Sequence, residues 1–144
     1  MARIFSIFVS FCIAAGVWAA PLHRRQTGDL QCNLARLRII SDISGAETLI
    51  GQLNTTELST ATAVAVAQAG LKSVDSAIQD ILTAVFAGQT APANSRAQVD
   101  AGVNTTLNAL AMITDPSANA TVTEVLSKLA SAATDGNDVV TECK

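Results

Sequence analysis

The longest hydrophobic pattern in this chain runs through residues 59–86. Its apolar positions alternate in steps of three and four, which places them on one stripe of an α-helix. A stripe this narrow has to be buried against other helices, because a single helix cannot remove it from water. The stripe consists of Val64, Ala67, Leu71, Val74, Ile78, Ile81 and Val85.

Three further segments carry stripes of the same kind and predict three partner helices. The first should run from about Asp29 or Gln31 to Leu53, the third over about 92–113, and the fourth from about Pro116 or Asn119 to Thr141. Because short connections force consecutive helices to run antiparallel, we expect an all-α fold, an antiparallel up-down-up-down four-helix bundle. The predicted core positions are Leu34, Leu37, Ile40, Ile43, Ala46, Ile50 and Leu53 in the first helix, Val99, Val103, Leu107, Leu110 and Ile113 in the third, and Val122, Val125, Leu129, Ala132, Val139 and Cys143 in the fourth.

The connection before residue 59 carries two competing signals at one side chain. Asn54 is placed to cap the next helix, with Glu57 three residues later to complete a capping box. Asn54-Thr55-Thr56 is also an N-glycosylation sequon, and a glycan on Asn54 would compete with its capping role. Both interpretations stay open at this point. At the other end of this helix, Gly88 suits a left-handed C-terminal position.

The first 25 residues are expected to lie outside the bundle. A short basic start, an apolar run and small residues before a cleavage point predict a signal peptide over 1–19. Arg24-Arg25 predicts a second cut that would remove a propeptide, 20–25, although an uncut basic linker is the alternative. We expect the remaining residues, 26–144, to form one helical-bundle domain without a transmembrane segment. We therefore expect a secreted protein, located outside the cell or in the cell wall.

Cysteine usage agrees with this compartment. Cys12 belongs to the predicted signal peptide, which leaves Cys32 and Cys143 as an even pair in an oxidising environment. An antiparallel bundle brings the start of its first helix and the end of its fourth to the same end. We therefore expect Cys32 and Cys143 to form a disulfide bond, the alternatives being two free thiols or a bridge between molecules.

Composition argues against enzymatic chemistry. Hydrophobic residues make up 49% of the chain, aromatic residues only 3%, and tyrosine is missing. Cleavage would also remove His23, the single histidine, and would leave Phe86 as the sole aromatic residue. We expect no catalytic residues, no metal and no cofactor. The carboxylate pairs Asp75 with Asp80 and Asp135 with Asp138 are interpreted as helix surface. The acidic mature chain also argues against a nucleic-acid partner.

Three sequons predict a glycoprotein. They begin at Asn54, Asn104 and Asn119, and the middle one falls inside a predicted helix, where glycosylation requires the asparagine to face solvent. The apolar positions of all four helices are filled mostly by small aliphatic side chains. Either the helices approach one another closely, or the bundle keeps or opens an apolar cleft.

Several stretches carry a family resemblance: 39–44 (IISDIS), 73–78 (SVDSAI) and 103–110 (VNTTLNAL) in an alanine- and threonine-rich, aromatic-poor helical chain. From about Leu30 to Cys143 the chain resembles the fungal hydrophobic surface-binding protein A and cell-wall galactomannoprotein family. The resemblance implies a protein that binds hydrophobic surfaces or lipids at the fungal cell exterior and is not an enzyme.

Two functional hypotheses follow. In the first, a hydrophobic surface or a fatty-acid-like lipid is bound by the inner stripes of the second and third helices. In the second, the protein interacts with cell-wall material or another secreted protein, as a cell-wall component, effector or inhibitor-like bundle without a lipid ligand. The predicted ligand-lining residues of the first hypothesis are Leu71, Val74, Ile78, Ile81, Phe86, Leu107 and Leu110.

Overall fold

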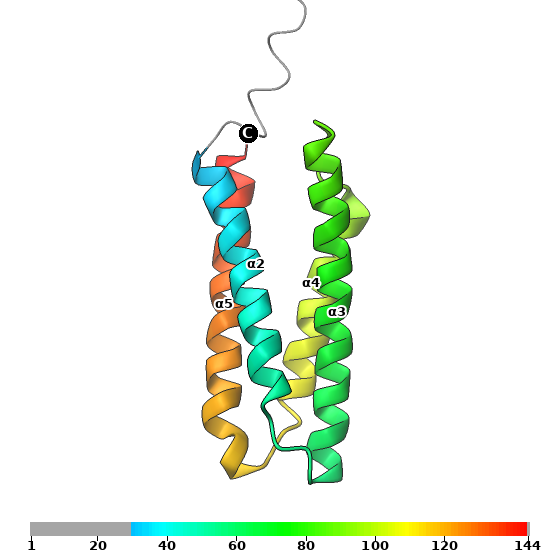
Figure 1. Ribbon diagram of the computed structural model, residues 1–144, viewed down its shortest axis with the longest axis vertical. Helices are drawn as coiled ribbons and strands as arrows, with labels where there is room; N and C mark the ends of the chain where they lie inside the picture. Colours follow the sequence, from blue (N-terminus) through cyan, green and yellow to red (C-terminus); the bar gives the residue numbers. More distant parts are fainter. Residues whose placement is uncertain (1–29, 144) are drawn as a thin grey trace, which may run out of the picture.

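The computed structural model describes residues 30–143, which form an antiparallel four-helix bundle (Figure 1). The predicted fold class is therefore confirmed, and the predicted helix ends are close to the observed ones. The predicted signal peptide, 1–19, and the segment 20–25 lie outside the described residues. The helices are α2 (Leu30–Gly51), α3 (Leu58–Phe86), α4 (Ala93–Leu110) and α5 (Asn119–Glu142), with a 3₁₀ turn, η1 (Pro116–Ala118), before α5.

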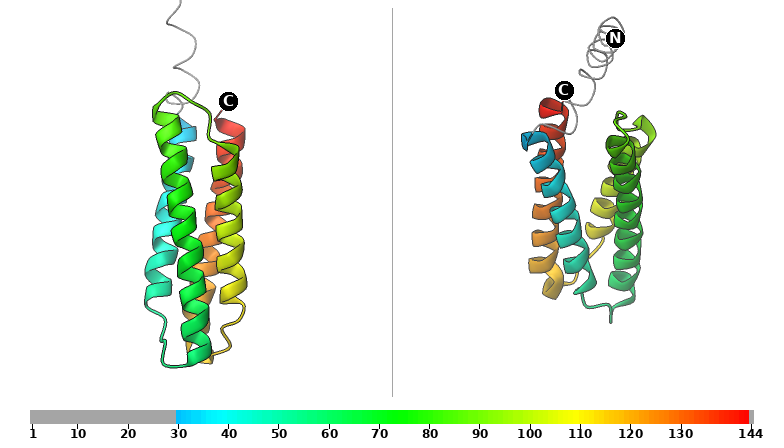
Figure 2. Two further views of the ribbon diagram at one scale, coloured as in Figure 1. Left: turned by 90° about the vertical axis from the view of Figure 1, so that its right-hand side faces the viewer. Right: turned by 45° about the horizontal axis from the view of Figure 1, so that its top comes forward.

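The four helices associate as two pairs. α2 packs chiefly on α5, and α3 packs chiefly on α4, whereas contacts between the pairs are fewer. The pairs lie closest where the α2–α3 and α4–α5 connections are found, and they diverge toward the other end (Figures 1 and 2). We call the first the connection end, defined by residues 52–57 and 111–115, and the second the disulfide end, defined by Cys32 and Cys143.

The α2–α5 pair is held by covalent and ionic contacts. The predicted bond between Cys32 and Cys143 is confirmed, with a Cα–Cα distance of 5.1 Å. Further along the pair, Lys128 Nζ lies 3.1 Å from Asp42 Oδ1. The disulfide joins two helices of the same pair, so it does not link the α2–α5 pair to the α3–α4 pair at the disulfide end.

The α3–α4 pair is held by close backbone approach. A Cβ atom added to Gly70 would lie 2.8 Å from the carbonyl oxygen of Gly102, and one added to Gly102 would lie 2.7 Å from that of Gly70. Beside this contact, the buried Thr106 hydroxyl shares its proton between the carbonyl oxygen of Gly102 in its own helix, at 3.0 Å, and that of Ala67 in α3, at 3.2 Å. Small side chains therefore bring this pair together closely, which was one of the two outcomes expected for the bundle.

A hydrophobic core joins the pairs over the half of the bundle nearest the connection end. Ile43, Ile50 and Leu71 are buried within it, and Ile78 packs against it from the side. Most of the stripe predicted for α3 is buried, with Ile78 and Ile81 half-buried. The buried members of this core are Ile43, Ala46, Ile50, Leu53, Ala63, Val64, Ala67, Leu71, Val74, Ala109, Leu110, Ile113, Ala118, Val125, Leu129 and Ala132.

The stripe predicted for α2 is wrong in its first half. Leu34, Leu37 and Ile40 are 36%, 63% and 36% exposed, whereas Ile43 and Ile50 are buried as predicted. The divergence of the pairs explains the difference, because the other pair covers only the C-terminal half of α2 (Figure 1). Toward the disulfide end, α2 buries a different face, which carries Cys32 and Ala35.

The capping box predicted at Asn54 is also wrong. Asn54 Oδ1 accepts hydrogen bonds from the Thr56 backbone N–H at 3.0 Å and from the Thr56 hydroxyl at 2.6 Å, so the side chain closes a local turn. Glu57 occupies the N-cap position of α3 and makes no side-chain capping bond. At the other end of α3, Gly88 has a φ of 72°, which confirms its predicted left-handed conformation.

Candidate functional site

The predicted ligand-lining residues divide into three groups in the structure. Leu71, Val74 and Leu110 are fully buried in the core that joins the two pairs. The half-buried Ile78 and Leu107 pack against that core, and the half-buried Ile81 lies one helical turn further toward the disulfide end. Six of the seven predicted residues thus follow the inner side of the α3–α4 pair.

Phe86 stands apart from the other six. It is the last residue of α3 and is 81% exposed. Its neighbour Val85 occupies the stripe position and is buried, and successive helical residues are about 100° apart around the axis, since there are about 3.6 residues per turn. The ring therefore lies on the surface at the disulfide end rather than beside Leu71.

Other large apolar side chains share that end of the molecule. We define the disulfide-end apolar surface by Leu30, Leu34, Leu37, Phe86 and Val140, which come from α2, α3 and α5 and are 36% to 81% exposed. Helical periodicity identified Leu34 and Leu37 as one apolar stripe but assigned them to the core. Their exposure depends on the divergence of the two pairs, for which the local sequence carries no signal.

A carboxyl pair links α2 and α3 across the two pairs. Burial raises the pKa of Glu47, and a hydrogen bond with Asp75 and the charge of Asp75 raise it further. A carboxyl held this way keeps its proton to a higher pH than an ordinary glutamate does. The sequence prediction paired Asp75 with Asp80 and missed Glu47, because contacts between helices cannot be read from spacing within one helix.

The acidic residue at the α2–α5 contact behaves in the opposite way. Burial opposes ionisation of Asp42, but hydrogen bonds with Ser131 and Lys128 and the positive charge of Lys128 outweigh it and lower the pKa of Asp42. A second ion pair joins Arg38 Nη1 to Asp135 Oδ1 at 3.8 Å. Opposite charges therefore stabilise the contact within this pair, whereas like charges oppose each other between the pairs.

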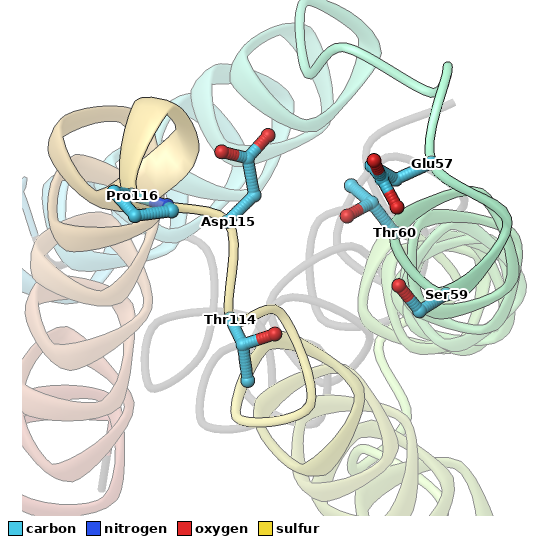
Figure 3. Close-up of a pocket in the computed structure, with 6 residues that line it drawn as sticks. All are labelled: Glu57, Ser59, Thr60, Thr114, Asp115 and Pro116. Atoms are coloured by element: carbon cyan, nitrogen blue, oxygen red, sulfur yellow. The ribbon is translucent and has the colours of Figure 1, made fainter.

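A polar pocket lies at the connection end, opposite the disulfide-end apolar surface. It has a volume of about 270 Å³ and lies between the start of α3 and the α4–α5 connection (Figure 3). Sequence reasoning did not find this pocket, because its two segments are far apart along the chain. The lining residues are Glu57, Ser59, Thr60, Thr114, Asp115 and Pro116.

The three predicted glycosylation sites are all accessible. Asn54, Asn104 and Asn119 are exposed, and Asn104 lies on the outer side of α4. Asn54 lies in the α2–α3 connection, within the connection end, and Asn119 lies just beyond the connection end as the first residue of α5. Glycans at these two positions would leave the disulfide-end apolar surface uncovered.

Within residues 30–143, no group of three or more His, Cys, Asp or Glu side chains is arranged to hold a metal ion. None of the described helices combines the length and the apolar character that crossing a bilayer requires. Comparisons of the chain with protein-family models, with curated proteins and with solved structures found no match.

Proposed function

We propose that the protein is a secreted, non-enzymatic binder of hydrophobic surfaces or lipids at the cell exterior. The observation that carries this proposal is the exposure of large apolar side chains at the end where the two helix pairs diverge. Five of the ten large hydrophobic side chains that are exposed in the described residues lie at this end, and contiguous apolar patches on soluble proteins mark sites that bind apolar partners. The family resemblance of residues 30–143 supports the same function.

The contacts within each helix pair suggest how an apolar ligand would enter between the two pairs. α2 and α5 share the disulfide and two ion pairs. α3 and α4 share the close Gly70–Gly102 contact and the Thr106 hydrogen bond. Both connections between the pairs lie at the connection end, so the pairs are free to separate further at the disulfide end while each pair stays intact.

Such a separation would expose the inner stripe of the α3–α4 pair. Burying apolar surface contributes about 25 cal/mol per Å², and this contribution is non-directional. An acyl chain or a waxy surface would therefore replace the contacts that Leu71, Ile78 and Leu107 lose when the pairs move apart. The same argument explains why a binder of this kind needs few polar groups in its site.

Adsorption and lipid binding test the proposal directly. We expect the purified mature protein to bind a fluorescent fatty acid saturably and to adsorb to hydrophobic beads. Phe86→Ala should weaken adsorption several-fold. It should change the free energy of unfolding by no more than about 0.5 kcal/mol, because the ring is 81% exposed. Leu126→Ala is the matched control, since Leu126 is a 40% exposed apolar residue on α5 away from this end.

Two results would contradict the proposal. One is the lack of both saturable fatty-acid binding and bead adsorption above a control helical bundle. The other is equal adsorption of the Phe86→Ala and Leu126→Ala variants with unchanged fatty-acid binding. After the first result, the interaction-protein hypothesis, with cell-wall material or another secreted protein as partner, would take its place. The second result would remove the disulfide-end apolar surface from the binding site.

A further inference from the structure

The polar pocket at the connection end is built from groups with unused hydrogen-bonding capacity. Thr60 is 2% exposed, and its hydroxyl has no hydrogen-bond partner among the residues that the structure describes. In Figure 3 this hydroxyl points across the pocket toward Thr114, whose own hydroxyl points back. Because buried hydroxyl groups are nearly always hydrogen-bonded, Thr60 indicates a ligand group in the pocket.

The start of α3 adds further donors. An α-helix leaves the first N–H groups without intrahelical acceptors, and a side-chain cap usually satisfies one of them. Glu57 makes no such capping bond. The first backbone bond of the helix runs from the Ala61 N–H to the Glu57 carbonyl oxygen, which leaves the N–H groups of residues 58–60 without an acceptor inside α3.

The opposite wall supplies acceptors. Asp115 accepts hydrogen bonds from the Ser117 N–H at 2.9 Å and from the Ser117 hydroxyl at 2.8 Å, which hold its carboxylate in place. A carboxylate has about four acceptor sites, so Asp115 keeps capacity for a ligand. The carboxylate of Glu57 is a second acceptor at the pocket.

This mixture of groups selects the chemical class of the ligand. The positive end of α3 opposes a cation, and the two carboxylates oppose an anion. A neutral molecule with many hydroxyl groups fits both walls, because each hydroxyl donates one hydrogen bond and accepts others. The pocket volume of about 270 Å³ lies near the lower limit of small-molecule sites, about 300 Å³, which suits a single ring rather than an oligosaccharide.

We propose that this pocket binds one sugar ring. The binding is separate from the apolar binding proposed above and uses the opposite end of the bundle. Two sources of the sugar share this chemistry. One is a free or cell-wall saccharide, and the other is the first sugar of the protein's own glycan, because Asn54 lies three residues before Glu57 and Asn119 three residues after Pro116.

The first arm of the test uses unglycosylated, disulfide-bonded protein. Titration with N-acetylglucosamine and with mannose, followed by amide NMR, should give saturable shifts at residues 57–60 and 114–116. Thr60→Val keeps the side-chain shape without the hydroxyl and should weaken binding at least tenfold. Thr62→Val is the matched control, because Thr62 is exposed on the same helix and its hydroxyl donates only to the Leu58 carbonyl oxygen. Thr114→Val tests the opposite wall at an exposed position that does not contribute to the core.

The second arm uses glycosylated protein trimmed to a single N-acetylglucosamine at each site. If the protein's own glycan fills the pocket, the amide signals of Thr60 and Thr114 will already be shifted, and Asn54→Gln or Asn119→Gln will reverse the shift. If they are unshifted and free sugar still binds, the source is external. The proposal is overturned if neither sugar nor the attached glycan perturbs these signals, or if both Thr60→Val and Thr114→Val bind sugar as tightly as wild type. Loss of fatty-acid binding would not affect either arm.

Discussion

The two helix pairs are stabilised by different kinds of contact. The α2–α5 pair combines a disulfide with ion pairs in which a largely buried carboxylate meets a more exposed base. The α3–α4 pair uses two glycines and hydrogen bonds to backbone carbonyl groups, including one from the Gln98 amide to the Ser73 carbonyl oxygen at 3.2 Å. Each pair is therefore stabilised by specific contacts between its own two helices, whereas the contact between the pairs is mainly apolar.

This difference gives the terminal disulfide a limited role. A disulfide that joined the α2–α5 pair to the α3–α4 pair would resist the separation of the two pairs. The observed bond joins α2 to α5, so it stabilises one pair and leaves the relation between the pairs to the hydrophobic core and to the two connections. The molecule thus combines a covalently closed chain with an end at which the helices diverge.

Removing the disulfide is the strongest way to test this comparison. Replacing both Cys32 and Cys143 with alanine should lower the free energy of unfolding by about 2–5 kcal/mol, because a long loop in the unfolded chain is no longer closed. Urea unfolding measures the loss. Native-state hydrogen exchange should show that protection falls first near the disulfide end of α2 and α5, with α3 and α4 less affected. An equal loss of protection in both pairs at low denaturant would contradict the two-pair description.

Filling the glycine contact tests the other pair. Gly70→Ala should destabilise the protein by about 1–3 kcal/mol, because the new methyl group meets the backbone of α4. Gly136→Ala is the matched control, since nothing lies within 4 Å of a Cβ at that position of α5. The control should stabilise the protein by up to about 1 kcal/mol through helix propensity. If both substitutions raised the free energy of unfolding, the close approach of α3 and α4 would be wrong.

The carboxyl contact between the pairs should have the smallest effect. The pKa of Glu47 is raised in the folded state above its ordinary 4.5. The folded protein therefore binds more protons than the unfolded chain once the pH exceeds 4.5, and the free energy of unfolding falls as pH rises through the raised pKa. Below pH 4.5, Glu47 is protonated in both the folded and the unfolded state, so its contact with Asp75 does not lower the free energy of unfolding there.

Glu47→Gln should remove this pH dependence. The amide keeps a donor for Asp75 without the charge, so the variant should exceed wild type in stability near neutral pH by a few tenths to about 1 kcal/mol. Urea unfolding between pH 5 and pH 7, in a range where Asp42 with its lowered pKa stays ionised, isolates the effect. The control is Glu124→Gln, at an exposed position on α5. Parallel pH profiles for wild type and Glu47→Gln would show that the carboxyl pair does not act on stability.

The local sequence pattern was sufficient to predict the four helices and their antiparallel directions. The spacing of Val64, Leu71 and Val74 predicted α3, and short connections predicted antiparallel neighbours. Those two steps also placed Cys32 and Cys143 together, because helix length and reversal of direction determine which ends meet. The assignments to a signal peptide, 1–19, and to glycosylated asparagines remain predictions.

Only the tertiary structure decided which apolar residues are covered. Leu37 and Ile43 belong to one stripe of α2, yet Leu37 is 63% exposed and Ile43 is 2% exposed. The polar pocket and the contact of Glu47 with Asp75 likewise join residues from different helices or connections. Periodicity specifies the face of a helix on which a side chain lies, because that depends only on the rise and turn of the backbone. Whether another helix covers that face depends on the angle between the two helix pairs, and this angle arises from packing across the whole bundle.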